Sequence, residues 1–153
     1  KADLNDWEPD QEYDIVLASP PCNEFTEMRR TTGHYHYSER IGLDLVYRTF
    51  YLISQIKPKF WVIENVWGLS EFLPPPRDIV RYGFHKCDRK SLRGGSKRAY
   101  LWGNFPELGF FEESIDYVSY YSPNTTAAER VKRAEIPLAL SRQLAKRMRD
   151  ELC

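Results

Sequence analysis

A cysteine that follows two prolines is the first residue of this sequence that could carry out chemistry. The residues Ile15–Ala18 are apolar and favour a β-strand, and they are followed by Ser19, Pro20, Pro21 and Cys22. Proline cannot donate to a sheet ladder, so the strand must end there. Cys22 is therefore expected just beyond the carboxyl end of a strand, where ligands collect in open parallel α/β sheets. The alternative interpretation is a small buried hydrophobic residue.

A carboxylate follows a second apolar strand in the same way. Residues 60–63 lead directly into Glu64 and Asn65, and the chain is expected to turn at Gly68. A catalytic acid is one interpretation of Glu64, and a salt-bridged carboxylate at a strand end is the other. Asn65 is expected to be structural and to fix the turn after the strand.

The segment between the two strands predicts how they are arranged. Residues 41–56 place apolar side chains at the spacing of a helix that buries one face, and Lys57 and Pro58 are expected to end this helix. Strand, helix and strand together predict a βαβ unit with parallel strands and a right-handed crossover. Such a unit would bring Cys22 and Glu64 to the same edge of a sheet.

Two stretches, SPPCNEFT at residues 19–26 and VIENVWGL at residues 62–69, together resemble the fourth and sixth motifs of the cytosine-5 methyltransferases. These enzymes methylate carbon 5 of cytosine in DNA or, in a few relatives, in tRNA. A third stretch, SKRAYLWGN at residues 96–104, is similar to an arginine-bearing strand of the family. The resemblance implies an α/β fold with a partial Rossmann-like methyltransferase sheet, in which a parallel βαβ unit is followed by an antiparallel edge hairpin.

The resemblance also implies roles for individual residues. Cys22 would add to carbon 6 of cytosine, Glu64 would assist at ring nitrogen 3, and Arg98 would contact the base and its phosphate. Ser96 stands where the family has the first arginine of its arginine-x-arginine motif, so only half of that motif is present.

The cofactor implied by the resemblance is S-adenosylmethionine. The candidate cofactor-binding residues are Asp3, Ser19 and Pro20. In the family an acidic residue that precedes the cysteine lies near the adenosine, and Asp3 matches that position. No glycine-rich loop follows a predicted strand. We therefore expect the glycine-rich cofactor motif on a missing N-terminal segment or on a second chain.

DNA is the expected partner, although the whole-chain charge does not indicate it. The sequence has 22 basic and 22 acidic residues, so a surface for nucleic acid must be local. Arg29, Arg30 and Lys97 are the candidate phosphate contacts. The short stretch between Gly103 and the last helix leaves no room for a separate target recognition domain. We expect residues 1–153 to form a single catalytic-half domain.

Three further elements are expected in the second half of the chain. A short helix is predicted over residues 77–82, and strands over residues 84–90 and 98–102 are predicted to be hairpin partners. Residues 129–153 predict an amphipathic helix entered through Pro137, with three apolar residues repeating along one face: Leu140, Leu144 and Met148. This apolar stripe could be exposed to a partner.

Several classes of protein are disfavoured by the composition. Three cysteines without CxxC spacing indicate neither a disulfide framework nor a zinc ribbon, and His34, His36 and His85 lack the ligand spacing of a metal site. No apolar run approaches the roughly 20 residues of a membrane span. We expect a soluble, cytoplasmic protein from a bacterium, an archaeon or a phage.

The sequence leaves three hypotheses about function. The leading one is an S-adenosylmethionine-dependent DNA cytosine-5 methyltransferase. The second is a remnant of that fold that binds nucleic acid or a partner without catalysis, and the third is a tRNA cytosine-5 methyltransferase.

Overall fold

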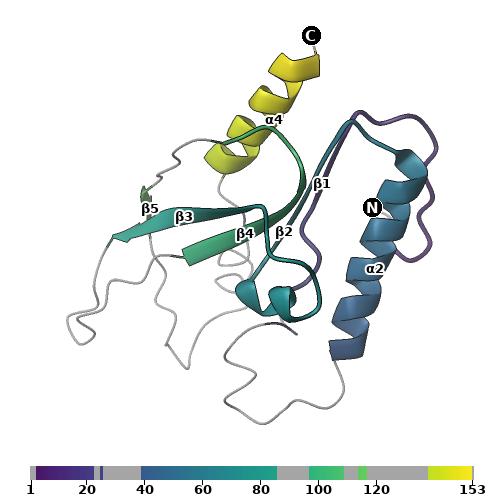
Figure 1. Cartoon of the computed structure of the whole chain (residues 1–153), viewed down its shortest axis with the longest axis horizontal. Coiled ribbons are helices and arrows are strands. Elements are labelled where there is room, and N and C mark those ends of the chain that lie inside the picture. Colours follow the sequence, from purple (N-terminus) through teal and green to yellow (C-terminus); the bar gives the residue numbers. More distant parts are fainter. Residues whose placement is uncertain are drawn as a thin grey trace. The chain divides into compact units, whose positions relative to one another are not determined.

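The computed structural model describes residues 3–22, 25, 39–85, 97–108, 114–116 and 138–152 (Figure 1). The elements, in chain order, are β1 (Ile15–Ala18), α2 (Glu39–Ile56), β2 (Phe60–Asn65), the 3-10 helix η2 (Trp67–Glu71), β3 (Asp78–His85), β4 (Lys97–Asn104), β5 (Ser114–Asp116) and α4 (Leu138–Leu152). The described strands follow the hydrogen-bonded order β1-β2-β4-β3-β5. The protein is thus a mixed α/β fold, as the sequence predicts.

Strands β1 and β2 form the predicted parallel βαβ unit with α2 between them. Their register pairs Ile15 with Phe60 and Ala18 with Ile63. On its other side β2 pairs with β4 in antiparallel orientation. The parallel pair confirms the arrangement inferred from the strand, helix and strand pattern.

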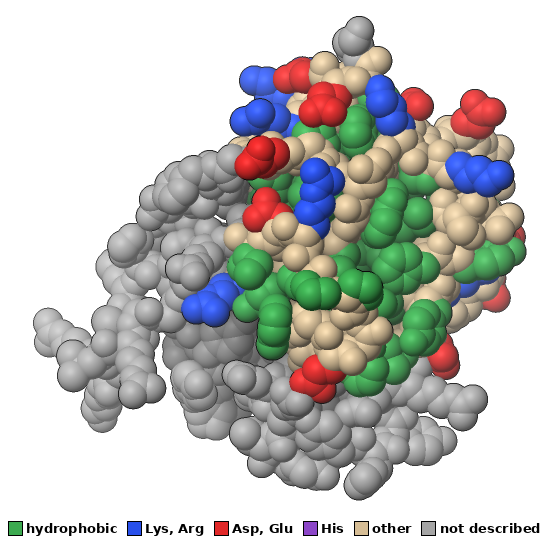
Figure 2. All heavy atoms as spheres, in the orientation of Figure 1, with side chains coloured by type: hydrophobic (Ala, Val, Ile, Leu, Met, Phe, Trp, Pro, Cys, Tyr) green, Lys and Arg blue, Asp and Glu red, His purple; other side chains and the backbone are tan. Residues whose placement is uncertain are grey.

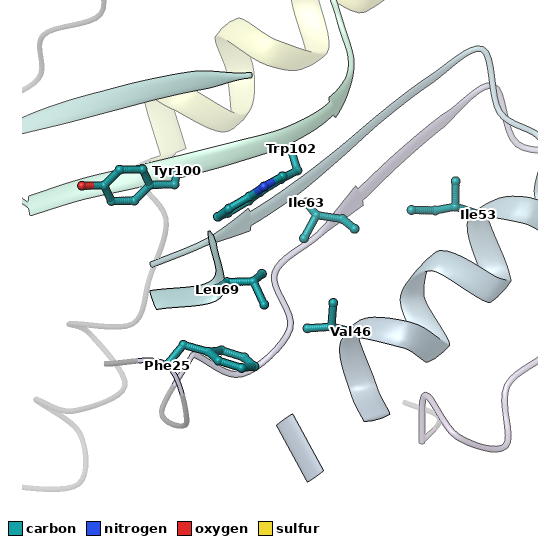
Figure 3. Packing of buried hydrophobic residues seen from close by; sticks show 7 residues of the cluster. All are labelled: Phe25, Val46, Ile53, Ile63, Leu69, Tyr100 and Trp102. Carbon is teal, nitrogen blue, oxygen red and sulfur yellow. The ribbon is translucent and has the colours of Figure 1, made fainter. Parts of the chain in front are cut away.

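Helix α2 forms because its apolar side chains repeat along one face. Val46 and Ile53 of this face are buried, and Figure 3 shows both pointing towards Ile63 of β2. The helix ends where predicted, at Lys57, which has a left-handed φ of 52° and donates its N–H to Ile53 O at 2.9 Å. A left-handed residue is a common way to satisfy a carbonyl at a helix end.

One hydrophobic cluster joins the helix to the strands and to the turn after β2. Its buried members are the seven residues drawn in Figure 3: Phe25, Val46, Ile53, Ile63, Leu69, Tyr100 and Trp102. Trp102 also donates its indole N–H to Pro74 O at 2.8 Å, which satisfies the only polar atom of that side chain. The cluster therefore fixes β2, β4 and η2 as one packed body.

The predicted helix over residues 77–82 is wrong, because residues 78–82 belong to strand β3. Ile79, Val80 and Tyr82 are β-branched or aromatic residues that fit a strand, and the backbone pairs with neighbouring strands in the sheet. Sheet pairing supplies backbone partners that a six-residue helix could not supply for itself. The turn expected at Gly68 is a short 3-10 helix, η2.

The strands predicted next to this stretch agree with the structure where it describes them. Residues 98–102 lie within β4, and β3 and β4 are neighbours in the sheet, as the hairpin prediction required. Only residues 84 and 85 of the strand expected over 84–90 are among the described residues, and both belong to β3. Strand β3 pairs with β5 in parallel, with Phe84 opposite Ile115.

The chain divides into two compact units. The first comprises residues 1–80 and 99–105, and the second comprises residues 81–98 and 106–153. The βαβ unit and the hydrophobic cluster belong to the first. The expectation of a single catalytic-half domain without a recognition domain stays a prediction.

Helix α4 of the second unit is the amphipathic helix predicted from the sequence. The sequence allowed the apolar stripe of this helix to be exposed, but the structure buries it. Leu140, Leu144 and Met148 have exposures of 0, 5 and 0%. Gln143 on the same helix donates to Leu108 O at 2.9 Å. Burial of an apolar face is the ordinary outcome for such a helix, since it removes that face from water. Pro137, the predicted entry, lies outside the described residues.

Candidate active site

The carboxyl ends of β1 and β2 lie side by side and are joined by a hydrogen bond between side chains. Ala18 pairs with Ile63, so the next residues of the two strands, Ser19 and Glu64, stand at the same level. The Ser19 hydroxyl donates to Glu64 Oε2 at 2.7 Å. The structure thus brings the two predicted motifs together at one edge of the sheet.

A second bond anchors the loop after β1. Asn65 is fully buried, and its Nδ2 donates to Pro20 O at 3.0 Å while its Oδ1 accepts the N–H of Val66 at 2.9 Å. A buried amide must find partners of this kind, because an unpaired one would cost the full free energy of desolvation. This geometry matches the structural role expected of Asn65, and it holds the proline pair against the end of β2.

Cys22 follows the anchored prolines directly. Two residues span at most about 7 Å, so the Cys22 backbone stays close to the Pro20 carbonyl that Asn65 holds. Cys22 is half-buried and takes part in no disulfide. Its carbonyl accepts the N–H of Phe25 at 3.0 Å, which closes a turn just after the cysteine. The thiol is therefore carried on a short, tied loop at the same edge as Glu64.

Sequence reasoning missed two residues that complete this loop. Phe25 is 5% exposed and belongs to the hydrophobic cluster, and its backbone lies against Gly68. A Cβ added at Gly68 would overlap the Phe25 carbonyl oxygen and lie 2.9 Å from the carbonyl carbon. One signal was available in the sequence: Phe25 is a large apolar residue within an otherwise polar stretch.

The residues expected at S-adenosylmethionine differ in what they could offer such a ligand. Asp3 is exposed, and its Oδ1 accepts the N–H of Asn5 at 2.9 Å, which leaves Oδ2 as a possible acceptor. Ser19 is exposed as well. Pro20 is buried, and its carbonyl is already bonded to Asn65. Asp3 and Ser19 therefore fit a polar cofactor, whereas Pro20 supports the cysteine loop.

Arg48 of α2 ties the segment that carries Asp3 to the helix. Its guanidinium donates to Trp7 O at 2.6 Å, to Leu4 O at 3.2 Å and to Glu8 Oε1 at 2.7 Å. The same group lies 5.0 Å from the centre of the Tyr51 ring. A planar guanidinium can bind several acceptors at once, which makes arginine suited to this position.

The candidate contacts to nucleic acid are placed only in part. Arg98 is exposed and is the second residue of β4, in the second unit. Lys97 begins the same strand, but its side chain is outside the described residues, as are Arg29 and Arg30 entirely. Their roles stay predictions.

Basic and acidic side chains are interspersed on the face shown in Figure 2, with hydrophobic side chains between them. The described residues of this face therefore form no large area of one sign. Within the described ranges, no group of three or more His, Cys, Asp or Glu residues could hold a metal ion. His34 and His36 lie outside those ranges. No described helix is long and apolar enough to cross a membrane.

Comparison with known proteins supports the interpretation of this edge. Residues 2–72 match the family model of C-5 cytosine-specific DNA methylases. A probable DNA (cytosine-5)-methyltransferase of Frog virus 3 (isolate Goorha) is 31% identical over 60% of this chain. The alignment covers 46% of the relative, so the chain matches about half of that protein's length. Members of this family generally use S-adenosylmethionine as the methyl donor.

The matched segment contains the whole of the edge described above, from Asp3 and the Cys22 loop to Glu64, Asn65 and Gly68. The segment of residues 2–72, with its paired strands and hydrogen-bonded motifs, is thus similar to the C-5 cytosine-specific DNA methylases.

Proposed function

We propose that this chain carries the nucleophile and the acid of an S-adenosylmethionine-dependent methyl transfer to carbon 5 of cytosine in DNA. The observation that supports the proposal best is the pair of bonds between the two motifs, Ser19 to Glu64 and Asn65 to Pro20. These bonds bring a cysteine loop and a carboxylate to one edge of the sheet. DNA is preferred to tRNA because the family model and the relative are both described by action on DNA.

In the proposed reaction the chain first activates carbon 5. The Cys22 thiolate attacks carbon 6 of cytosine, so that a sulfur–carbon bond forms and the electrons of the carbon 5–carbon 6 double bond move into the ring. Glu64 gives a proton to ring nitrogen 3, which neutralises the developing charge. Because the Ser19 hydroxyl occupies Oε2, Oε1 is the oxygen that would face the base. Carbon 5 then becomes nucleophilic.

The remaining steps restore the base. S-adenosylmethionine, when bound, supplies the methyl group for carbon 5, and Asp3 and Ser19 are the residues that would contact it. Loss of the carbon 5 proton to water re-forms the carbon 5–carbon 6 double bond and expels the Cys22 thiolate, and ring nitrogen 3 returns its proton to Glu64. In a duplex the base must first leave the stack, at a cost of about a few kcal/mol.

The addition step can be tested without the cofactor. While Cys22 is bound to carbon 6, carbon 5 can take a proton from water and then lose the hydrogen it carried before. An oligonucleotide with cytosine tritiated at carbon 5 should therefore release tritium when it is incubated with the protein. We expect no release above background from Cys22→Ser and release lowered by about 100-fold or more in Glu64→Gln. Cys153→Ser serves as the control.

Two further arms separate the alternatives. An oligonucleotide with 5-fluorocytosine should become covalently attached to Cys22 only when S-adenosylmethionine is present, because fluorine cannot leave as a proton does. Tritium release without covalent attachment would indicate a competent nucleophile without a usable cofactor site. If the protein binds the oligonucleotide but shows neither tritium release nor covalent attachment, a non-catalytic remnant is favoured. Release of tritium from tRNA but not from DNA would favour the tRNA enzyme.

A further inference from the structure

Among the described residues that follow Cys22, Phe25 makes a close backbone contact that is not a hydrogen bond. In this contact the backbone of Phe25 lies directly on the backbone of Gly68. Any side chain at position 68 would overlap the Phe25 carbonyl oxygen, so only glycine permits this approach. Gly68 comes four residues after Glu64, and Phe25 comes three residues after Cys22. The contact therefore joins the two motifs a third time, beyond the bonds made by Ser19 and Asn65.

The side chain of Phe25 also packs against the rest of the protein. The ring is 5% exposed, lies in the hydrophobic cluster, and has its centre 5.9 Å from that of Phe72 with a tilted geometry. Leu69, the neighbour of Gly68, is fully buried in the same cluster. Both partners of the backbone contact are thus anchored in the cluster, Phe25 by its own buried ring and Gly68 by the buried Leu69 next to it.

A hydrogen bond transmits this anchoring to the cysteine. The Phe25 N–H donates to Cys22 O at 3.0 Å, so the peptide groups on both sides of the loop are tied. At the other end of the loop, Pro20 O is held by Asn65. Cys22 therefore sits between two fixed points, each of which is attached to the segment that carries Glu64.

We propose that Phe25 and Gly68 are positioning residues, which set the place of the Cys22 thiol relative to Glu64. This inference rests on the proposed function. A nucleophile must lie within about 3.5 Å of the atom that it attacks, and a misplacement of about 1 Å can cost roughly 100-fold in rate. A loop held only at Pro20 would leave the thiol free to move over such distances.

The chain offers a matched control for the test, Gly103 in β4. A Cβ at Gly103 would overlap Trp61 O and lie 2.9 Å from the Trp61 carbonyl carbon, which is the same kind of backbone clash. Gly103 also has a φ of 147°, which strains any other residue. In the register of β2 and β4, Gly103 pairs with Val62, two residues before Glu64, and its clash is with Trp61 and not with the cysteine loop. Gly103→Ala should therefore destabilise the same unit without moving the cysteine loop.

The experiment compares Gly68→Ala with Gly103→Ala at a temperature where thermal unfolding shows both to be folded. The first readout is the rate of tritium release from cytosine in DNA. We expect Gly68→Ala to lower the maximal rate by roughly 100-fold with an oligonucleotide KM within about threefold of the starting protein, and Gly103→Ala to change both by less than threefold. Equal losses in the two variants would overturn the proposal.

A second readout does not depend on the proposed reaction. In a protein with Cys87→Ser and Cys153→Ser, the rate of Cys22 alkylation by iodoacetamide is measured against pH. Gly68→Ala should shift this profile, while Gly103→Ala should not, because only the first moves the thiol. An unchanged profile for Gly68→Ala overturns the inference. If the starting protein releases no tritium but the profile still shifts, the proposed function has failed and the positioning has not.

Phe25→Leu and Phe25→Ala cover the case in which Gly68→Ala does not fold. Leucine keeps an apolar side chain in the cluster, so it should retain most of the release rate, whereas alanine should lose it roughly tenfold or more. A Phe25→Ala protein that is folded and as fast as the starting protein would overturn the role of Phe25.

Discussion

The two parallel strands that carry the candidate site are held in different ways. Strand β2 lies between β1 and β4, and four of its six residues are buried. Strand β1 is the first in the order of described strands, and none of its residues is fully buried, with Leu17 at 48% exposure. Burial fixes the strand with the carboxylate, and specific polar bonds fix the end of the strand with the cysteine.

This difference has a physical reason in the loop itself. Two prolines cannot contribute N–H groups to a ladder, so the chain beyond β1 cannot be held by sheet pairing. Side chains from β2 replace the missing ladder bonds: Asn65 holds a proline carbonyl and Glu64 accepts from Ser19. The more buried strand, β2, therefore fixes the position of the cysteine loop through its side chains.

The largest expected effect comes from replacing an isoleucine by alanine in each of the two strands, which tests the difference in their burial. Ile63→Ala removes a side chain that is 0% exposed in the cluster and should cost about 3 to 4 kcal/mol in the free energy of unfolding. Ile15→Ala removes the same atoms from a half-buried position of β1 and should cost about 1 to 2 kcal/mol. Urea denaturation measures both. Equal losses would contradict the contrast between the strands.

The next effect tests the polar anchor of the cysteine loop. Asn65→Ala leaves the Pro20 carbonyl and the Val66 N–H without their partner and should cost about 2 to 3 kcal/mol. Asn104→Ala is the matched control, since Asn104 donates to Lys59 O at 2.9 Å but is exposed. Its loss should stay below about 1 kcal/mol. If both changes cost the same in urea denaturation, burial does not explain the anchor.

A smaller effect concerns the segment that precedes β1. Arg48→Met keeps an apolar stem but removes the bonds to Leu4 O and Trp7 O, and should cost about 1 to 2 kcal/mol. Glu8→Gln removes an ion pair whose carboxylate side chain is 59% exposed, and should cost at most about 0.5 kcal/mol. Hydrogen exchange of the amides of residues 4–8 should rise in Arg48→Met alone.

Ser19→Ala should separate stability from chemistry. The hydroxyl is exposed, so its loss should change the free energy of unfolding by only about 0.5 kcal/mol. Its bond to Glu64 fixes the carboxylate, so tritium release should fall roughly tenfold. Ser19→Thr keeps a hydroxyl and should recover most of the rate. An equally slow threonine variant would show that the bond is not the cause.

The smallest effect is a pH dependence near the start of β1. The hydroxyl of Tyr13 donates to Asp10 Oδ1 at 2.7 Å, and this bond raises the pKa of Tyr13 above its ordinary value of 10.0. A raised pKa means stability that is present below pH 10.0 and lost as the pH rises through the folded-state value. Tyr13→Phe should remove this slight alkaline loss. A thermal melting series from pH 8 to about pH 11 checks it against the starting protein.

The elements around the site could be predicted because each has a local signal. The strand before the prolines, the helix over α2 and its end at Lys57 all follow from periodicity and from turn residues. The stretch that forms β3 was misread because a short apolar run reads alike as helix and strand, and only pairing with other strands decides between them. The contact between Phe25 and Gly68 joins residues that are 43 positions apart in the sequence. The whole fold brings such residues together, so no local pattern predicts their contact.

The bond from Asn65 to Pro20 has a consequence for biosynthesis. The two residues are 45 positions apart, so the ribosome adds the asparagine about 2 to 9 seconds after the proline at ordinary rates of synthesis. During that interval the nascent chain carries Cys22 without the segment that will anchor it. The thiol of a growing chain therefore leaves the ribosome before the carboxylate that will lie beside it. A cell that slows translation over residues 22–68 would lengthen this interval.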